Sequence, residues 1–279
     1  MIVADTPHTA SGEHGDVSQT PVVILCGGLG TRLKEETEFV PKPLVKIGEF
    51  PVLWHVMKIY QAQGFRKFIL LVGHKGEKIK EYFYSYPIHY SDFTLRFHSS
   101  GHDFIQHTRP SEDWEVTLID TGRTSESGVR LKKAAGLLQN STFMLTYADG
   151  VADINLHELL SVHRASGKMA TVSAVRPPGR FGELAVSGNV ATGFQEKPSS
   201  QSGLINGGFF AMEPGVFRFF PDEPMLHFEK DVLPKIAAAS ELAVYRHPGY
   251  WQCMDTLRDM ELLNEKWNAG EAPWKIWKD

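Results

Sequence analysis

The chain reads Leu25-Cys26-Gly27-Gly28-Leu29-Gly30-Thr31-Arg32-Leu33 at the end of its first apolar run, 22–25, and this stretch is its most informative feature. A short apolar run before glycines is typical of a buried parallel strand. A glycine-rich turn after such a strand leaves backbone N–H groups uncovered, so it can cradle phosphate oxygens and admit a nucleotide base. The glycines follow neither the dinucleotide pattern G-x-G-x-x-G nor the P-loop pattern, which argues against both types of site.

Two basic residues follow the turn, Arg32 directly and Lys42 within Pro41-Lys42-Pro43. They supply positive charge where a bound triphosphate would require it. From these residues alone a simple tight turn remains an alternative, because glycines after a strand are common in turns.

The composition argues against several classes of function. The chain has 279 residues, with 29 basic and 33 acidic residues and a net charge of −4. This balance disfavours a nucleic-acid partner, which would need a basic surface. Cys26 and Cys253 lie far apart without a C-x-x-C pair, so we expect neither a disulfide framework nor a zinc site, as in a cytoplasmic protein. No apolar run approaches the roughly 18 residues that cross a bilayer, so no membrane partner is expected.

The chain is expected to form one domain. Residues 1–20 are polar and lack the apolar core of a secretory signal, so we expect a flexible leader there and a single domain over 21–279. Strand-like and helix-like segments alternate in the first half, which predicts a Rossmann-like α/β fold with a mixed, mostly parallel sheet flanked by helices.

The periodicity of the apolar residues locates the further elements. Strands are expected at 68–72, 116–119, 143–146, 170–175 and 205–212, with a hairpin at 181–194 that turns at Ser187-Gly188-Asn189. Helices are expected at 51–63, 77–84, 130–138, 156–165, 228–239 and 255–267. The aromatic- and histidine-rich segment 84–109 is expected to be an irregular surface excursion and a candidate oligomer contact.

Asp149 follows the strand expected at 143–146, within Thr146-Tyr147-Ala148-Asp149-Gly150. Ligands of open α/β sheets bind beyond the carboxyl ends of the strands. A carboxylate at that edge, facing a phosphate cradle, can hold Mg²⁺ and tie it to phosphate oxygens. Taken alone, Asp-Gly favours a turn or a helix cap, so this alternative stays open.

Several motifs together resemble the sugar-nucleotide pyrophosphorylases, nucleotidyltransferases that join a sugar 1-phosphate to a nucleoside triphosphate. The resemblance covers nearly everything from Pro21 to Trp277. Its motifs are G-G-L-G-T-R-L at 27–33, P-K-P at 41–43, T-Y-A-D-G-V-A-D at 146–153, E-K-P at 196–198, N-x-G at 206–208 and W-x-x-x-D at 251–255. A GT-A-like fold is the expectation that follows.

The resemblance also implies roles for individual residues. The implied nucleotide site consists of Leu25, Cys26, Gly27, Gly28, Gly30, Thr31, Arg32, Lys42, Ser125, Arg130 and Ala148. Implied contacts to the sugar phosphate come from Gly182, Glu196, Lys197 and Asn206. Arg32 and Lys42 are the implied catalytic residues, and Asp149 with Asp255 is the implied Mg²⁺ pair. Locally, Asp255-Thr256 would equally serve as a helix N-cap. Ala148 stands where cytidylyltransferases of the family typically carry Gly.

Two stretches narrow the implied substrates: S-x-x-G-x-R-L-K at 125–132 and G-T-R-L-x-E-E-T at 30–37. They resemble the family members that transfer a cytidylyl group from CTP to glucose 1-phosphate, giving CDP-glucose and pyrophosphate. The reaction implied is an in-line attack without a covalent intermediate. Open alternatives are another nucleotide such as dTTP or UTP, another sugar 1-phosphate, or a non-catalytic nucleotide-sugar sensor. A homo-oligomer is also implied.

Overall fold

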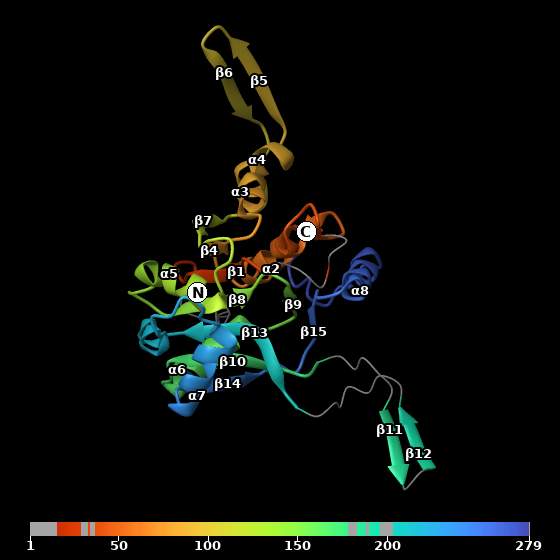
Figure 1. The fold of residues 1–279 in the computed structure, drawn as a ribbon. Coiled ribbons are helices and arrows are strands. Elements are labelled where there is room, and N and C mark those ends of the chain that lie inside the picture. The colour runs from red at the N-terminus through yellow and green to blue at the C-terminus, as the bar shows by residue number, and fades with distance from the viewer. Residues whose placement is uncertain are drawn as a thin grey trace, which may run out of the picture.

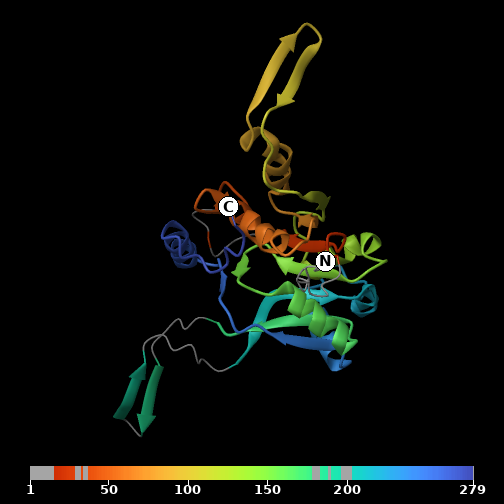
Figure 2. The same cartoon turned by 180° about the vertical axis from the view of Figure 1, so that it is seen from behind.

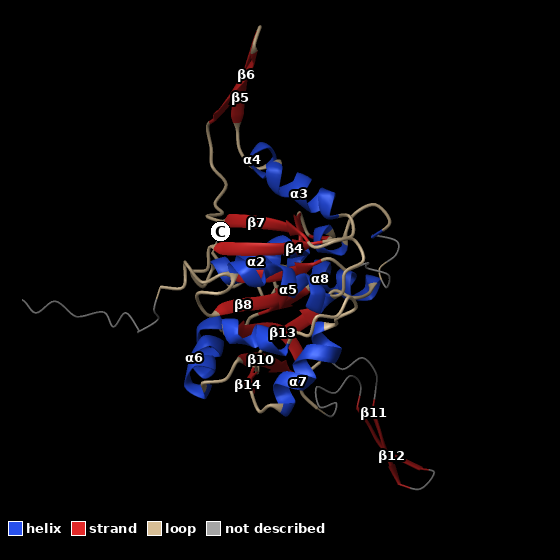
Figure 3. Ribbon diagram, turned by 60° about the vertical axis from the view of Figure 1, so that its left-hand side comes forward, coloured by secondary structure: helices blue, strands red, loops and turns tan. Residues whose placement is uncertain are grey.

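The computed structural model describes residues 16–28, 33, 37–177, 183–187, 190–195 and 203–278. Within these residues, seven strands form one central sheet in the order β14-β10-β13-β8-β1-β4-β7 (Figures 1 and 3). Strand β13 runs antiparallel to both of its neighbours, and the other pairs are parallel. The predicted mixed, mostly parallel sheet is therefore confirmed. Its strands are β1 Val22–Cys26, β4 Lys67–Val72, β7 Glu115–Asp120, β8 Phe143–Tyr147, β10 Ala170–Val175, β13 Ile205–Met212 and β14 Leu242–Arg246.

Helices lie between the strands, near the predicted positions. They are α2 Val52–Gln61, α3 Gly76–Tyr84, α4 Tyr86–His89, α5 Ser127–Ala134, α6 Leu156–Ser166, α7 Leu233–Ala238 and α8 Leu257–Asn268. Short 3-10 turns are η1 Lys42–Leu44, η2 Ala135–Leu137 and η3 Pro214–Phe219. Four two-stranded pairs complete the fold: β2 Lys46–Ile47 with β3 Phe50–Pro51, β5 Phe93–His98 with β6 Gly101–Gln106, β9 Gly150–Ala152 with β15 Trp251–Cys253, and β11 Glu183–Ser187 with β12 Val190–Gln195.

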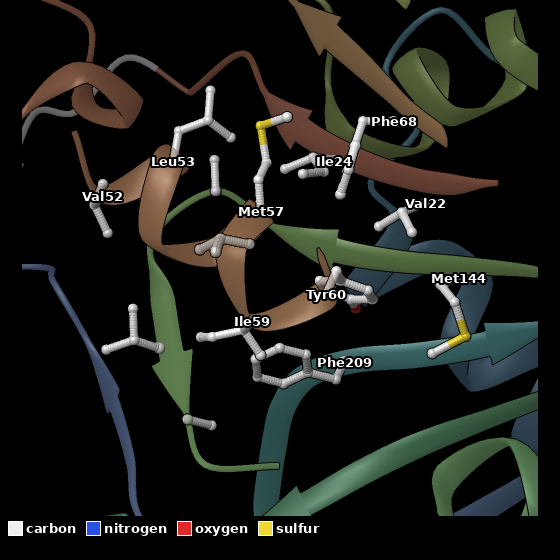
Figure 4. Packing of buried hydrophobic residues seen from close by; sticks show 14 of the residues in the cluster. Val22, Ile24, Val52, Leu53, Met57, Ile59, Tyr60, Phe68, Met144 and Phe209 are labelled. Atoms are coloured by element: carbon white, nitrogen blue, oxygen red, sulfur yellow. The ribbon is translucent and has the colours of Figure 1, made fainter. Parts of the chain in front are cut away.

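The core has two parts, one on each face of the sheet. Side chains alternate between the faces along a strand. Ile24 accordingly packs into the cluster that contains α2, whereas the adjacent Val23 packs into the cluster that contains α5 and α7. Met57 and Tyr60 of α2 lie against the strands in Figure 4. Full burial of one such apolar side chain stabilises the fold by about 1.5–3 kcal/mol.

Helix α2 is buried on nearly all sides because the C-terminal segment covers the side that the sheet does not. Every residue from Val52 to Tyr60 is buried. The ring of His55 lies 4.6 Å from that of Trp267, and its Nδ1 is 3.4 Å from Nε1 of Trp274. A helix that is buried around its circumference needs such a cover on both sides.

The prediction that segment 84–109 is irregular was wrong, whereas the surface excursion expected there is present. It contains α4 and the hairpin β5–β6, which projects from the body of the molecule (Figures 1 and 2). Residues 93–98 alternate apolar and polar side chains, F-T-L-R-F-H, which is the period of a half-exposed strand. The abundance of His and aromatic residues concealed this two-residue period.

Two further boundaries differ from the expectations. Val17 is buried against the core, so packing includes at least this residue of the expected leader; residues 1–15 lie outside the described part. The helix expected at 228–239 is a π-helical turn, η4 Phe228–Val232, followed by α7. Pro234 explains the division, since it lacks the N–H that an α-helix would direct at Lys230 and its ring would meet that carbonyl. No helix in the described part has the length and apolar character that crossing a membrane requires.

The buried His55 predicts a pH dependence of stability. Burial lowers its pKa from 6.5 to about 4. Because Trp274 Nε1 can only donate, His55 Nδ1 accepts and its Nε2 donates to the Ile47 carbonyl at 2.9 Å, so the ring is neutral. A lowered histidine pKa means that the unfolded chain binds the proton more readily. Stability from this group is therefore complete above about pH 6.5 and is lost as the pH falls towards 4.

Urea unfolding at pH 7 and pH 5 measures this effect. His55 should lower the free energy of unfolding by about 2 kcal/mol when the pH falls from 7 to 5. His55→Gln retains a donor and an acceptor but has no proton to bind, so its loss should be smaller by that amount. An equal pH dependence in the two proteins would contradict the neutral, buried assignment.

Candidate active site

A cavity of about 660 Å³ opens at the carboxyl ends of the neighbouring parallel strands β1 and β8. Nine residues implied for the nucleotide or metal site line it, namely Leu25, Cys26, Gly27, Gly28, Lys42, Ser125, Arg130, Ala148 and Asp149. The polar side chains Arg123, Glu126, His227 and Glu229 border the same space. Six implied site residues lie outside the described part of the chain: Gly30, Thr31, Arg32, Gly182, Glu196 and Lys197.

Arg130 of α5 reaches under the glycine turn and holds it. Its Nη2 donates to the Gly27 carbonyl at 2.8 Å. Its Nη1 donates to Thr121 Oγ1 at 2.6 Å, to the Gly122 carbonyl at 3.0 Å and to the Val72 carbonyl at 3.3 Å. The guanidinium thus joins the ends of β1, β4 and β7 into one floor beneath the cavity. Although Arg130 borders the cavity, these four hydrogen bonds go to protein atoms rather than outwards.

Gly27 lies against the Arg130 guanidinium, where a larger residue would not fit. A Cβ built on Gly27 would lie 2.1 Å from Cζ of Arg130, far inside contact distance. A Cβ on Gly28 would meet no described atom within 4 Å. The two neighbouring glycines therefore have different roles, one in packing on Arg130 and the other at the open cavity.

The two glycines give a matched pair of variants. Gly27→Ala should destabilise the fold by about 1–3 kcal/mol, because four hydrogen bonds must shift to admit one methyl group. Gly28→Ala should change the unfolding free energy by no more than about 0.5 kcal/mol. Urea titrations of both variants measure the difference, and similar losses would contradict the packing role of Arg130.

Lys42 lies between two carboxylates at the edge of the cavity. Its Nζ is 2.6 Å from Oδ2 of Asp149 and 2.6 Å from Oδ1 of Asp255. Pro41 and Pro43 on either side restrict the backbone that carries it. Burial alone would disfavour the ammonium, but the charges and hydrogen bonds of the two carboxylates outweigh it and raise the pKa of Lys42. The group is therefore a permanent cation.

The two carboxylates meet because two short strands pair. β9 and β15 are antiparallel, with Val151 opposite Gln252 and Gly150 opposite Cys253. The Met254 N–H donates to the Asp149 carbonyl at 2.9 Å, which extends this register by one step. Asp149, just before β9, therefore lies beside Asp255, just after β15.

The cap of α8 is Thr256, not Asp255. The Thr256 side chain accepts from the Asp259 N–H, and Asp259 reaches back to the N-cap backbone in a capping box. Because Thr256 takes this role, the carboxylate of Asp255 is available to Lys42. The N-cap expected locally at Asp255-Thr256 is therefore present, and Thr256 provides it.

A second cavity of about 230 Å³ adjoins the same centre. Asp149, Asp255, Asn206 and Trp251 are among its lining residues. Asn206 stands near the start of β13, and because β13 is antiparallel to β8 and β10, its first residues lie beside their carboxyl ends. The one reversed strand of the sheet thus brings Asn206 to the edge where Asp149 lies.

Tyr147 and Glu229 border the larger cavity and were missed in the sequence. Tyr147 also borders the smaller cavity. Tyr147 belongs to the motif T-Y-A-D, so its position beside Asp149 could have identified it as a site residue. Glu229 lies in the π-helical turn η4, and only the interruption at Pro234 pointed there.

Neither cysteine at the site is a ready nucleophile. Burial, together with the negative charge of Asp149, raises the pKa of the Cys26 thiol. Burial and then the charge of Asp255 raise the pKa of Cys253 to about 12. Both thiols are free and protonated at neutral pH. The described part of the site offers charge and hydrogen bonds rather than a covalent catalyst.

The described residues contain no group of three or more His, Cys, Asp or Glu side chains placed to hold a metal ion. Asp149 and Asp255 nevertheless direct one oxygen each at a single point, which Lys42 Nζ occupies. Two carboxylate oxygens suit Mg²⁺, which takes one or two protein oxygens beside waters and substrate phosphates.

Comparison with known proteins agrees with this geometry. Residues 21–269 match the model of the nucleotidyl transferase family, and the chain belongs to that family. The glucose-1-phosphate cytidylyltransferase of Salmonella typhi is 46% identical over 257 residues, which are 92% of this chain and 99% of that protein. The enzyme of the same name from Salmonella typhimurium matches equally, at 46% over 257 residues with the same coverage.

The solved structures support the fold. HddC from Yersinia pseudotuberculosis, complexed with GMP-PN, superimposes with a TM-score of 0.64 over 89% of this chain and 100% of that chain. Its sequence identity is 22%, so this likeness concerns the arrangement of the elements alone. The expected GT-A-like nucleotidyltransferase architecture is confirmed.

Proposed function

We propose that this chain transfers the cytidylyl group of CTP to α-D-glucose 1-phosphate, giving CDP-glucose and pyrophosphate. The observation that carries the proposal is the pair of adjoining cavities that share Tyr147 and Asp149, with Lys42 of the larger cavity bound to Asp149 and Asp255 of the smaller one. The larger has room for a nucleotide beside the glycine turn, and the smaller presents Asn206 and carboxylates. The 46% identity to glucose-1-phosphate cytidylyltransferases along nearly the whole chain favours CTP and glucose 1-phosphate as the pair.

The chemistry needs position and charge more than proton transfer. A phosphate oxygen of glucose 1-phosphate attacks the α-phosphorus of CTP, and the bond from that phosphorus to the pyrophosphate oxygen breaks in line. The sugar phosphate is already ionised at neutral pH, so no strong base is required. Lys42, charged in its carboxylate environment, would lie between the α-phosphate and the incoming phosphate and would stabilise charge there.

Asp149 and Asp255 would hold Mg²⁺, and the protein would then be magnesium-dependent. When bound, the ion would neutralise phosphate oxygens and draw both substrates to one point. Lys42 already lies 2.6 Å from both carboxylates, so its ammonium and a bound cation would compete for the same two oxygens. Lys42 would then turn from the carboxylates towards the phosphates. Arg32 would add positive charge at the departing pyrophosphate, in the role that the family resemblance implies.

The nucleotide choice is tested by pyrophosphate release. Purified protein is given Mg²⁺ and glucose 1-phosphate with CTP, UTP, dTTP or ATP separately. Turnover with CTP well above the other three is expected. Turnover with another nucleotide would contradict the base choice but keep the reaction. If no nucleotide is turned over with glucose 1-phosphate, the assay is repeated with a panel of other sugar 1-phosphates. No pyrophosphate release in any combination would contradict catalysis and favour a nucleotide-sugar sensor.

We also propose that the chain forms a homo-oligomer in the cytoplasm, where nucleoside triphosphates are available. The projecting β5–β6 hairpin supports an interface between copies. Phe97 is 79% exposed, and Leu95 is paired across the hairpin with Phe104, which is also exposed. Exposed apolar side chains on a projecting hairpin are typical of protein contacts.

Light scattering on the eluted protein measures the assembly. A Leu95→Asp and Phe97→Asp double variant should lower the molecular mass relative to the wild type. Arg96→Asp, on the other face of β5, is the matched control and should elute as the wild type does. An unchanged mass in the double variant would remove the hairpin from the interface.

A further inference from the structure

Glu229 lines the larger cavity, and a chain of hydrogen bonds links it to Asn206 in the smaller one. Its carboxylate receives two hydroxyl hydrogen bonds, from Ser127 Oγ at 2.6 Å and from Tyr147 Oη at 2.8 Å. The Ser127 hydroxyl also accepts from the Phe228 N–H at 2.9 Å, so its own proton is directed at Glu229. Both carboxylate oxygens of Glu229 therefore act as acceptors from fixed donors.

Tyr147 links Glu229 to Asn206 through its hydroxyl group. A tyrosine hydroxyl has one proton, and here that proton goes to Glu229. Its oxygen therefore accepts from Nδ2 of Asn206, at 3.4 Å. A tyrosine hydroxyl is protonated at neutral pH, so the proton that this hydrogen bond needs is present.

Asn206 is oriented at both ends of its amide. Its Nδ2 donates to Tyr147, and its Oδ1 accepts from the Gly208 N–H at 2.8 Å. Gly208 has a positive φ of 83°, and a Cβ there would lie 2.7 Å from the Tyr147 ring, so this close approach requires glycine. A primary amide in this arrangement keeps one N–H and one oxygen lone pair with which to meet sugar hydroxyls.

We infer that Glu229 is a positioning residue for the sugar 1-phosphate, acting through Tyr147 on Asn206. The inference rests on the proposed function and names a residue that the motifs do not include. An ionised carboxylate can only accept, so the hydrogen bonds run in one direction from Asn206 through Tyr147 to Glu229. A neutral amide at position 229 could donate instead. The Tyr147 hydroxyl could then turn its proton to Asn206, and the Gly208 N–H alone would hold the amide.

Steady-state kinetics with each substrate varied in turn test this inference. Glu229→Gln should raise the KM for glucose 1-phosphate about tenfold while the KM for CTP changes less than twofold. Tyr147→Phe should raise the same KM. The double variant should be little worse than the single ones, because both substitutions break one chain of hydrogen bonds.

The chain supplies a matched control. Tyr245 Oη donates to Glu158 at 2.7 Å, in a similar pair that lines neither cavity. Glu158→Gln should therefore leave both KM values within twofold of the wild type. Thermal melting of each variant identifies any general loss of folding, which would affect both substrates together.

The outcomes separate the inference from the proposed function. Normal wild-type turnover, with both KM values raised equally in Glu229→Gln or neither raised, would overturn the inference and leave the function standing. Additive effects of Glu229→Gln and Tyr147→Phe would also overturn it. A wild-type protein that turns over no nucleotide and sugar phosphate would overturn both.

Discussion

The contact of Lys42 with Asp149 and Asp255 is the interaction on which the rest of the site depends. Two carboxylates that direct oxygens at one point repel each other unless a cation lies between them. The ammonium provides that cation from a segment 107 residues away from one carboxylate and 213 from the other. The ion pairs therefore hold the loop after β1, the β8–β9 turn and the end of β15 together. These are the segments that border the two cavities.

The fold brings these segments together through ordinary rules of sheet construction. Parallel strands end at one edge, so the glycine turn after β1 and Asp149 after β8 become neighbours. The reversed strand β13 brings its beginning, with Asn206, to that same edge. The register of β9 and β15 then sets Asp255 beside Asp149. Backbone pairing thus positions both carboxylates, and Lys42 reaches them from the turn η1.

Much of this could be predicted from the sequence because the signals are local. The apolar run before Gly27 and the strand before Asp149 indicated the sheet edge. Lys42 was singled out as positive charge after the glycine turn, and the resemblance added Asp255. The contacts of Arg130 could not be predicted, since they depend on three loops converging beneath the turn. The hairpin at 93–106 was missed because its two-residue period was read as irregular. Glu229 was missed because its place depends on the wide turn that Pro234 imposes.

In the free protein, Lys42 is the cation between Asp149 and Asp255, and we expect a metal ion to compete with it for the two carboxylates. Electron paramagnetic resonance can follow Mn²⁺ binding to the substrate-free wild type and to Lys42→Met, with the exposed Lys46→Met as a control. Loss of the competing ammonium should make Lys42→Met bind Mn²⁺ at least about tenfold more tightly than the wild type, while Lys46→Met binds as the wild type does. Equal or weaker Mn²⁺ binding by folded Lys42→Met would show that the ammonium and the metal ion do not compete for one site.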